Sequence, residues 1–119
     1  MDMAEECSPL IDRGEYEEPP RSRGFPLLRY LVAHRRYDFR DKAYKQLSDG
    51  EFELLDLEHA VLYGAVKKTE VDEQHNSVGN KKYTILGKDT HGYDFYCCAK
   101  MIQALDGTLV LIITAHWAN

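Results

Sequence analysis

Cysteine is scarce in this chain, and long hydrophobic runs are absent. Three cysteines occur in 119 residues, at Cys7, Cys97 and Cys98, and this odd number with an adjacent pair argues against a secreted disulfide framework. The longest apolar run, Leu109 to Ile113, has the length of a strand, whereas a membrane-spanning helix needs ~20 apolar residues. The acidic N-terminus has neither the basic start nor the apolar stretch of a signal peptide. We therefore expect a soluble, cytoplasmic protein with no membrane partner.

Motifs that hold metals or phosphates are also missing. The chain has no Cys-x-x-Cys and no pair of histidines at helical spacing. On a strand, Cys97 and Cys98 point to opposite faces and cannot share an ion. Gly87, Gly92 and Gly107 stand in predicted turns and form no glycine-rich phosphate loop. The sequence thus predicts no metal site and no cofactor.

The net charge of −5 is distributed unevenly along the chain. Residues 1–23 carry seven acids and three arginines, a net of −4, while residues 24–119 are nearly neutral at −1. Residues 29–45 reach +4, because six bases face only Asp38 and Asp41. These bases are Arg29, Arg35, Arg36, Arg40, Lys42 and Lys45. Such a segment is either a solvated helix face or a surface that attracts phosphate or an acidic partner.

The composition and length predict one domain preceded by an arm. A chain of 119 residues with 44% apolar residues can bury one ordinary core. Residues 1–24 are rich in charge and contain Pro19-Pro20, which disfavours regular structure. We expect an acidic N-terminal arm over residues 1–24 and a single domain over residues 25–119.

Three helices are predicted in the first half of this domain. Pro26 suits a first helical turn, and apolar residues then recur at helical spacing, which predicts a helix over 26–35. A second helix is predicted over 40–48, ended by Gly50. Apolar residues between 54 and 61 mark a third helix that stops at Gly64.

After Gly64 the apolar pattern alternates, which predicts strands over 66–71, 82–87, 93–102 and 108–117. Asp106-Gly107 is a strong hairpin signal between the last two strands. The predicted fold is α+β, with two or three N-terminal helices packed on one face of a four-stranded antiparallel β-meander.

Short strings of residues along this order carry a family resemblance. They are Leu28-Arg29-Tyr30-Leu31-Val32, Tyr37-Asp38-Phe39, Asp56 to Gly64, Lys82 to Gly87, and Ile112-Ile113-Thr114-Ala115. Over residues 27–116 the chain resembles the small bacterial and archaeal domains of unknown function numbered forty-two fifty-eight. That family is similar to the BrnT and RelE toxins, which are small ribonucleases. The resemblance implies a toxin-like, RNA-cleaving fold, RNA as a ligand and an antitoxin-like protein as a partner.

The chain departs from the family at two positions. Lys42 precedes Ala43 where family members carry a histidine, and Gly50 stands near the place of an arginine. If those family residues are catalytic, the departures imply that this chain has lost the reaction. Fold alone does not establish activity.

His116 is the best single candidate for an acid or base in metal-independent RNA cleavage. It ends the last predicted strand, on the face that we expect it to share with Val110, Ile112 and Thr114. RelE-like toxins keep a functional histidine or tyrosine near the C-terminus, which the resemblance makes relevant. The alternative for His116 is an unperturbed surface histidine.

Cations and aromatic side chains complete the predicted site. Lys42 is the second candidate catalytic residue, and Arg35, Arg36 and Arg40 are candidates for binding phosphate, because a guanidinium matches phosphate oxygens. Tyr83 could offer a hydroxyl or a stacking face, although core or half-buried packing explains a tyrosine on a strand better.

Two functions of different classes follow. The first is a metal-independent endoribonuclease or RNA-binding protein of the RelE or BrnT type. The second is a non-catalytic protein-interaction domain on the same fold, which pairs with an acidic segment or forms a homodimer through an exposed strand.

Overall fold

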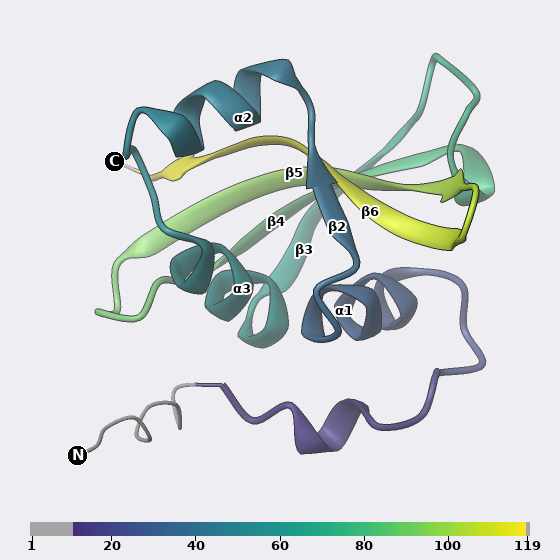
Figure 1. Ribbon diagram of the computed structural model, residues 1–119, viewed down its shortest axis with the longest axis horizontal. Coiled ribbons are helices and arrows are strands. Elements are labelled where there is room, and N and C mark those ends of the chain that lie inside the picture. Colours follow the sequence, from purple (N-terminus) through teal and green to yellow (C-terminus); the bar gives the residue numbers. More distant parts are fainter. Residues whose placement is uncertain (1–10, 119) are drawn as a thin grey trace.

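The structure is a computed structural model that describes residues 11–118 (Figure 1). The elements are η2 Gly14–Tyr16, α1 Phe25–Ala33, β2 Tyr37–Phe39, α2 Asp41–Ser48, α3 Leu54–Tyr63, β3 Ala65–Val71, η3 Val78–Asn80, β4 Lys81–Lys88, β5 Asp94–Ala104 and β6 Gly107–Trp117. The predicted α+β class is confirmed, with three helices packed on a five-stranded mixed sheet. Within residues 11–118 no helix is long and apolar enough to cross a membrane.

The three predicted α-helices are present, and local chemistry explains where they end. α1 has Pro26 in its first turn, where a missing N–H costs nothing. It ends at Ala33, two residues earlier than predicted, because Arg35 adopts a φ of 57° that breaks the helical path. α2 ends before Gly50, whose φ is 76°, and α3 ends before Gly64, as predicted.

The sequence prediction missed one strand. β2 pairs in parallel with β6, and its ends are held by hydrogen bonds from the N–H of Arg40 to Ile112 O (2.9 Å) and from the N–H of Val110 to Arg36 O (3.0 Å). The predicted four-stranded antiparallel meander is present as β3 to β6, but the sheet has a fifth strand and one parallel pair, in the order β2-β6-β5-β4-β3. Three residues are too few to display an alternating pattern, and their partner lies far away in the sequence.

The meander of β3 to β6 agrees with the prediction within two residues at each end. The hairpin predicted at Asp106-Gly107 joins β5 to β6, with Leu105 and Asp106 as its loop residues. Gly107 adopts a φ of 124°, which explains why glycine stands there.

A β-bulge in β6 changes which side chains face the helices. Ala99 pairs with Ile112 and Cys98 pairs with Thr114, so Ile113 has no residue opposite it. An extra residue on one strand shifts the alternation of every side chain that follows it. The last four residues of β6 therefore point the opposite way from where strict alternation would place them.

The predicted face for His116 is consequently wrong. Val110 and Ile112 are fully buried beneath the helices, whereas Thr114 and His116, beyond the bulge, lie on the other face of the sheet. The prediction assumed unbroken alternation along the strand, and alternation reveals no bulge on its own.

α1 and α3 cover one face of the sheet, and α2 lies on the other side of the strands in Figure 1. α2 runs along β6 beyond β2, and the N–H of Ala115 donates to Oε1 of Gln46 at 3.3 Å. In the core, the ring of Phe95 packs edge-on against Phe52 and Trp117, with centroids 5.8 and 5.2 Å apart. This packing anchors the end of β6 to the helical face.

Residues 11–24, the described part of the predicted arm, lie against α1 and α3 (Figure 1). Ile11 is buried, and Arg13 donates to the carbonyl oxygen of Ala33 at 2.8 Å and forms an ion pair with Glu58. The hydroxyl of Tyr16 donates to Leu62 O at 3.4 Å. Residues 1–10, which carry three of the arm's acids, lie outside the described residues.

Candidate functional site

The face of the sheet opposite α1 and α3 carries mixed chemistry, and α2 lies beside it along β6. We call this face the open face. Strand pairing assigns to it Lys68, Glu70, Lys82, Thr84, Leu86, Tyr96, Cys98, Lys100, Ile102, Leu109, Leu111, Thr114 and His116. All of these except Lys100 are half-buried or exposed. Directly paired residues share a face, so this surface presents apolar, aromatic and basic groups together.

A groove of about 450 Å³ lies where α2 begins beside β6. Its lining is Phe39, Arg40, Asp41, Lys42, Leu111, Ile113 and Thr114. Two of the predicted cations, Arg40 and Lys42, therefore meet here. Lys42 is exposed and forms no hydrogen bond or ion pair with any residue between 11 and 118, which leaves its ammonium available to an anion.

His116 lies on the same face, two residues beyond the Thr114 of the groove. It pairs with Tyr96 across β5 and β6, and the two rings are 5.8 Å apart between centroids and inclined by 31°. His116 is exposed and Tyr96 is half-buried. The two rings thus form an aromatic pair on the open face, next to the basic groove.

The loop between β3 and β4, residues 72–77, lies over the open face, and we call this loop the arch. The Lys100 ammonium, in the middle of the face, donates to both carboxylate oxygens of Asp72 at 3.3 and 3.2 Å and to Gln74 and Asn76 at 2.8 and 2.7 Å. Oε1 of Gln74 also accepts a bond of 3.3 Å from Arg40 at the opposite edge. The arch therefore holds Arg40, one of the cations of the groove, through Gln74.

Asp72 is charged within this arch. Its pKa falls to about 2, because the hydroxyl of Ser77 donates to the carboxylate at 2.7 Å and outweighs the effect of burial, and because Lys100 and the N–H of Gln74 also donate to it. The ion pair with Lys100 keeps the arch in place over the strands.

The remaining predicted site residues lie elsewhere. Arg36 forms an ion pair with Asp106 at the β5–β6 hairpin (2.9 Å), and Arg35 forms one with Glu58 (3.3 Å). Tyr83 is buried on the helical face beside Phe25, and burial raises the pKa of its hydroxyl. The structure thus brings Arg40, Lys42 and His116 to one face and leaves Arg35, Arg36 and Tyr83 away from it.

The basic segment at residues 29–45 does not form one continuous stripe, because most of its cations are engaged separately. Arg29 stacks over the ring of Phe25 at 4.6 Å, and Lys45 pairs with Asp49 at 2.9 Å. With Arg35 and Arg36 also paired, only the cations at the start of α2 are placed to bind a ligand together.

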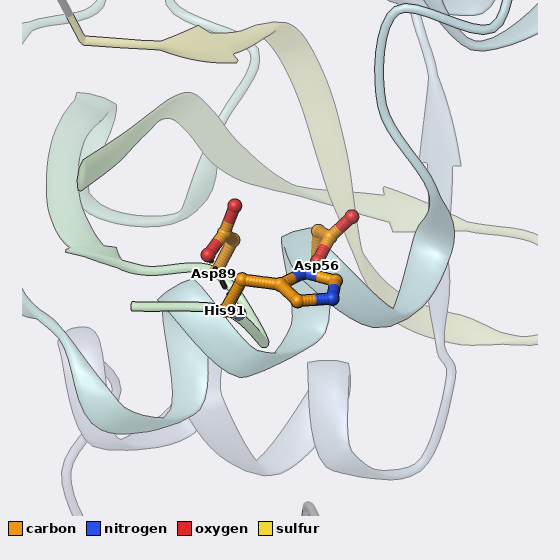
Figure 2. A group of neighbouring side chains, drawn as sticks. All are labelled: Asp56, Asp89 and His91. Carbon is orange, nitrogen blue, oxygen red and sulfur yellow. Dashed lines mark hydrogen bonds between the residues drawn. The ribbon is translucent and has the colours of Figure 1, made fainter. Parts of the chain in front are cut away.

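Sequence reasoning missed a cluster at the β4–β5 turn, shown in Figure 2. Asp56 comes from the first turn of α3, while Asp89 and His91 come from the turn, and one ligand atom of each lies within 4.8 Å of the others. Both carboxylates are buried and the imidazole is exposed. The Asp-x-His spacing of the turn was the only signal of this cluster available in the sequence, and it does not name the aspartate on α3.

Hydrogen bonds hold both carboxylates of the cluster. Oδ1 of Asp56 accepts from the N–H and the hydroxyl of Thr90 at 3.1 and 2.8 Å. Asp89 accepts the N–H groups of His91 and Tyr93 through Oδ1 (2.8 and 2.9 Å) and the indole N–H of Trp117 through Oδ2 (2.6 Å). Burial opposes the charged form of Asp89, but these bonds and the nearby imidazole outweigh it and lower its pKa.

Neither cysteine of β5 is placed as a nucleophile. Cys97 is buried on the helical face, and burial raises the pKa of its thiol. Cys98 lies half-buried on the open face, where burial also raises its pKa. Thiols that stay protonated are weak nucleophiles.

Comparison with known proteins gives no family for this chain: no family model, curated protein or solved structure matches it.

Proposed function

We propose that this domain binds single-stranded RNA on its open face. The observation that carries the proposal is the convergence of Arg40, Lys42 and the Tyr96–His116 ring pair along one face of β6. Proteins that bind single strands combine cations that contact the backbone with rings that stack on bases. Because the chain carries a net charge of −5, we expect the RNA to contact this local basic groove and not the surface as a whole.

The groove supplies the two kinds of contact in a fixed order. Arg40 and Lys42 flank the first turn of α2, whose free N–H groups favour an anion. The guanidinium suits two phosphate oxygens, while the ammonium acts as a point charge. The Tyr96–His116 ring pair lies further along β6, past Thr114. A strand whose phosphate is bound at α2 would therefore place its next bases near these rings.

Cleavage of the bound RNA is a second property that the same face would support. Metal-independent cleavage needs a base for the 2′-hydroxyl, an acid for the departing 5′-oxygen and a cation near the phosphate. His116 is the imidazole of the open face, and Lys42 is the free cation of the groove. At neutral pH the lysine serves as the electrostatic group and the histidine as the acid or base.

Binding is tested by fluorescence anisotropy of a labelled single-stranded RNA. We expect Arg40→Ala and Lys42→Ala each to weaken binding and to reduce the slope of log affinity against log salt by about 0.7. Tyr96→Ala should cost about 1–3 kcal/mol, the stacking of one base. Lys67→Ala, an exposed lysine on the outermost strand, is the matched control and should change neither quantity. Equal losses in Lys67→Ala and Lys42→Ala would overturn the proposal.

Cleavage is tested on the same RNA with a chelator present. A ribonuclease of this type should yield a 2′,3′-cyclic phosphate, and His116→Ala should abolish the product while leaving the circular dichroism spectrum unchanged. Binding without any cleavage would identify a binding domain that lacks the reaction, in line with the lysine at position 42.

A protein-interaction domain is the second candidate, and one observation favours it. Leu109, Leu111 and Ile113 are only half-buried apolar residues of β6, and Leu111 and Ile113 line the groove itself. If these residues form a homodimer interface, sedimentation should detect a dimer that Leu111→Lys dissociates. If the protein is a monomer at high concentration and still binds RNA, the homodimer is excluded and RNA binding is the function that stands.

A further inference from the structure

Four acidic side chains are buried in the described part of the chain, and they fall into two pairs. Glu58 has Arg13 and Arg35 as cationic partners, and Asp72 has Lys100. Asp56 and Asp89 are 8% and 3% exposed, and neither forms an ion pair with a lysine or arginine of residues 11–118. The second pair therefore has no lysine or arginine partner of the kind that each carboxylate of the first pair has.

The absence of a cation matters because the two carboxylates are close together. Their ligand atoms lie within 4.8 Å of each other, and also of an imidazole nitrogen of His91. Two like charges shielded from water repel strongly, and a buried acid is normally neutralised by a partner or a metal. Oδ2 of Asp56 accepts no hydrogen bond from residues 11–118, so this buried oxygen also lacks a donor.

We propose that Asp56, Asp89 and His91 together bind a divalent transition-metal ion, and that Zn²⁺ is the ion that they fit best. Two carboxylate oxygens with one imidazole nitrogen form a mixed set typical of first-row metals, and Zn²⁺ accepts both ligand types. The exposed imidazole marks the side of the ion that faces solvent. Three protein ligands leave a fourth position there for water or a substrate, as in catalytic zinc sites.

The surroundings of the cluster match those of a metal site. Ligating carboxylates are usually held in place by outer hydrogen bonds. The indole of Trp117 does this for Asp89 and the backbone and hydroxyl of Thr90 do it for Asp56, so two ligands are fixed before an ion arrives. A tetrahedral site with bonds of about 2.0 Å places its ligand atoms roughly 3.3 Å apart, so ligand atoms that now lie within 4.8 Å of one another need only small shifts to meet an ion.

The site is distinct from the RNA groove and does not depend on that proposal. Asp56 and Asp89 belong to α3 and to the β4–β5 turn, at the helical face of the sheet (Figure 2). The open face lies on the other side of the strands, and its histidine is His116 near the end of β6.

Trp117, the only tryptophan in the chain, provides the measurement, because its indole donates directly to Asp89. The full chain is titrated with Zn²⁺ while tryptophan fluorescence is recorded, and a chelating dye gives the stoichiometry. We expect one ion per chain, and a loss of affinity of at least tenfold in His91→Ala and in Asp56→Asn. His91 is exposed, so its replacement leaves the fold intact, and His116→Ala is the matched histidine control that should bind like the native chain.

Three results would overturn the proposal. They are no saturable binding, equal affinity in the native chain and His91→Ala, or a loss of binding in Cys98→Ser that His91→Ala does not share. The third would assign the ion to thiols. A rise in melting temperature with Zn²⁺ in the native chain and in His116→Ala, but not in His91→Ala, would support the site independently of fluorescence.

Discussion

The Lys100 ammonium lies 3.3 and 3.2 Å from the two carboxylate oxygens of Asp72, and both side chains are almost completely shielded from water. Gln74 and Asn76 complete the set of acceptors around the ammonium. Oxygen atoms from alternate residues of one loop thus surround a cation supplied by β5, an arrangement that resembles a loop around a bound metal ion. This cluster holds the arch over the open face.

Replacing Lys100 with methionine should therefore destabilise the protein strongly. Methionine has a similar length but no charge, so the substitution leaves the Asp72 carboxylate buried and unpaired, which costs about 3–5 kcal/mol. Urea unfolding measures this loss. Lys82→Met, on the neighbouring strand β4 and on the same face, is the control and should change stability by less than about 1 kcal/mol. Equal effects in the two variants would mean that the buried ion pair has no special role.

The same carboxylate makes stability depend on pH in acid. The pKa of Asp72 is lowered from 3.8 to about 2 in the folded chain, so folding favours its charged form. That contribution is complete above the unfolded pKa of about 3.8 and is lost as the pH falls toward about 2. Thermal unfolding between pH 5 and pH 2 should show a decline in stability that is shallower in Asp72→Asn. Parallel profiles for the two proteins would contradict this assignment.

Local signals were sufficient to predict most of the helices and strands. Gly50 and Gly64 follow α2 and α3 as the sequence indicated, and the Asp106-Gly107 signal marks the β5–β6 hairpin correctly. Each of these features is determined by residues adjacent in the chain. The periodicity of apolar residues and the residue types found in turns therefore predict these features from the sequence alone.

The features that were missed depend on contacts between distant segments. β2 exists because Tyr37–Phe39 meets β6, and the bulge at Ile113 exists because of its register with β5. The convergence of Asp56 with the β4–β5 turn requires α3 to lie against β4. For the site, the sequence named Arg40, Lys42 and His116 but could not assign them to one face, because the bulge decides the face of His116.

The close approach of α3 and β4 gives a sharp test of the packing. A Cβ atom at Gly87 would lie 2.1 Å from the carbonyl oxygen of Ala60, so Gly87→Ala must push the helix from the sheet. We expect a loss of roughly 3 kcal/mol or more, as for overpacking of a core. Gly50→Ala is the control, because a Cβ there meets nothing within 4 Å and only the positive φ is unfavourable, by about 1–2 kcal/mol. Chemical denaturation that ranks Gly50→Ala as the more harmful change would contradict this packing.

The buried Glu58 predicts how the segment before α1 is held. Its carboxylate contacts Arg13 from that segment, Tyr37 from β2 and Arg35, and it has no access to water. Arg13→Ala removes the main cation and should cost about 1–3 kcal/mol, because a charged acceptor is left under-satisfied. It should also free the segment, which limited trypsin digestion after Arg21 or Arg23 would detect as faster cleavage. Arg21→Lys keeps a cleavage site at an exposed position and should leave both the rate and the stability unchanged. If Arg13→Ala is cut no faster than this control, other contacts hold the segment and Glu58 is satisfied by Tyr37 and Arg35 alone.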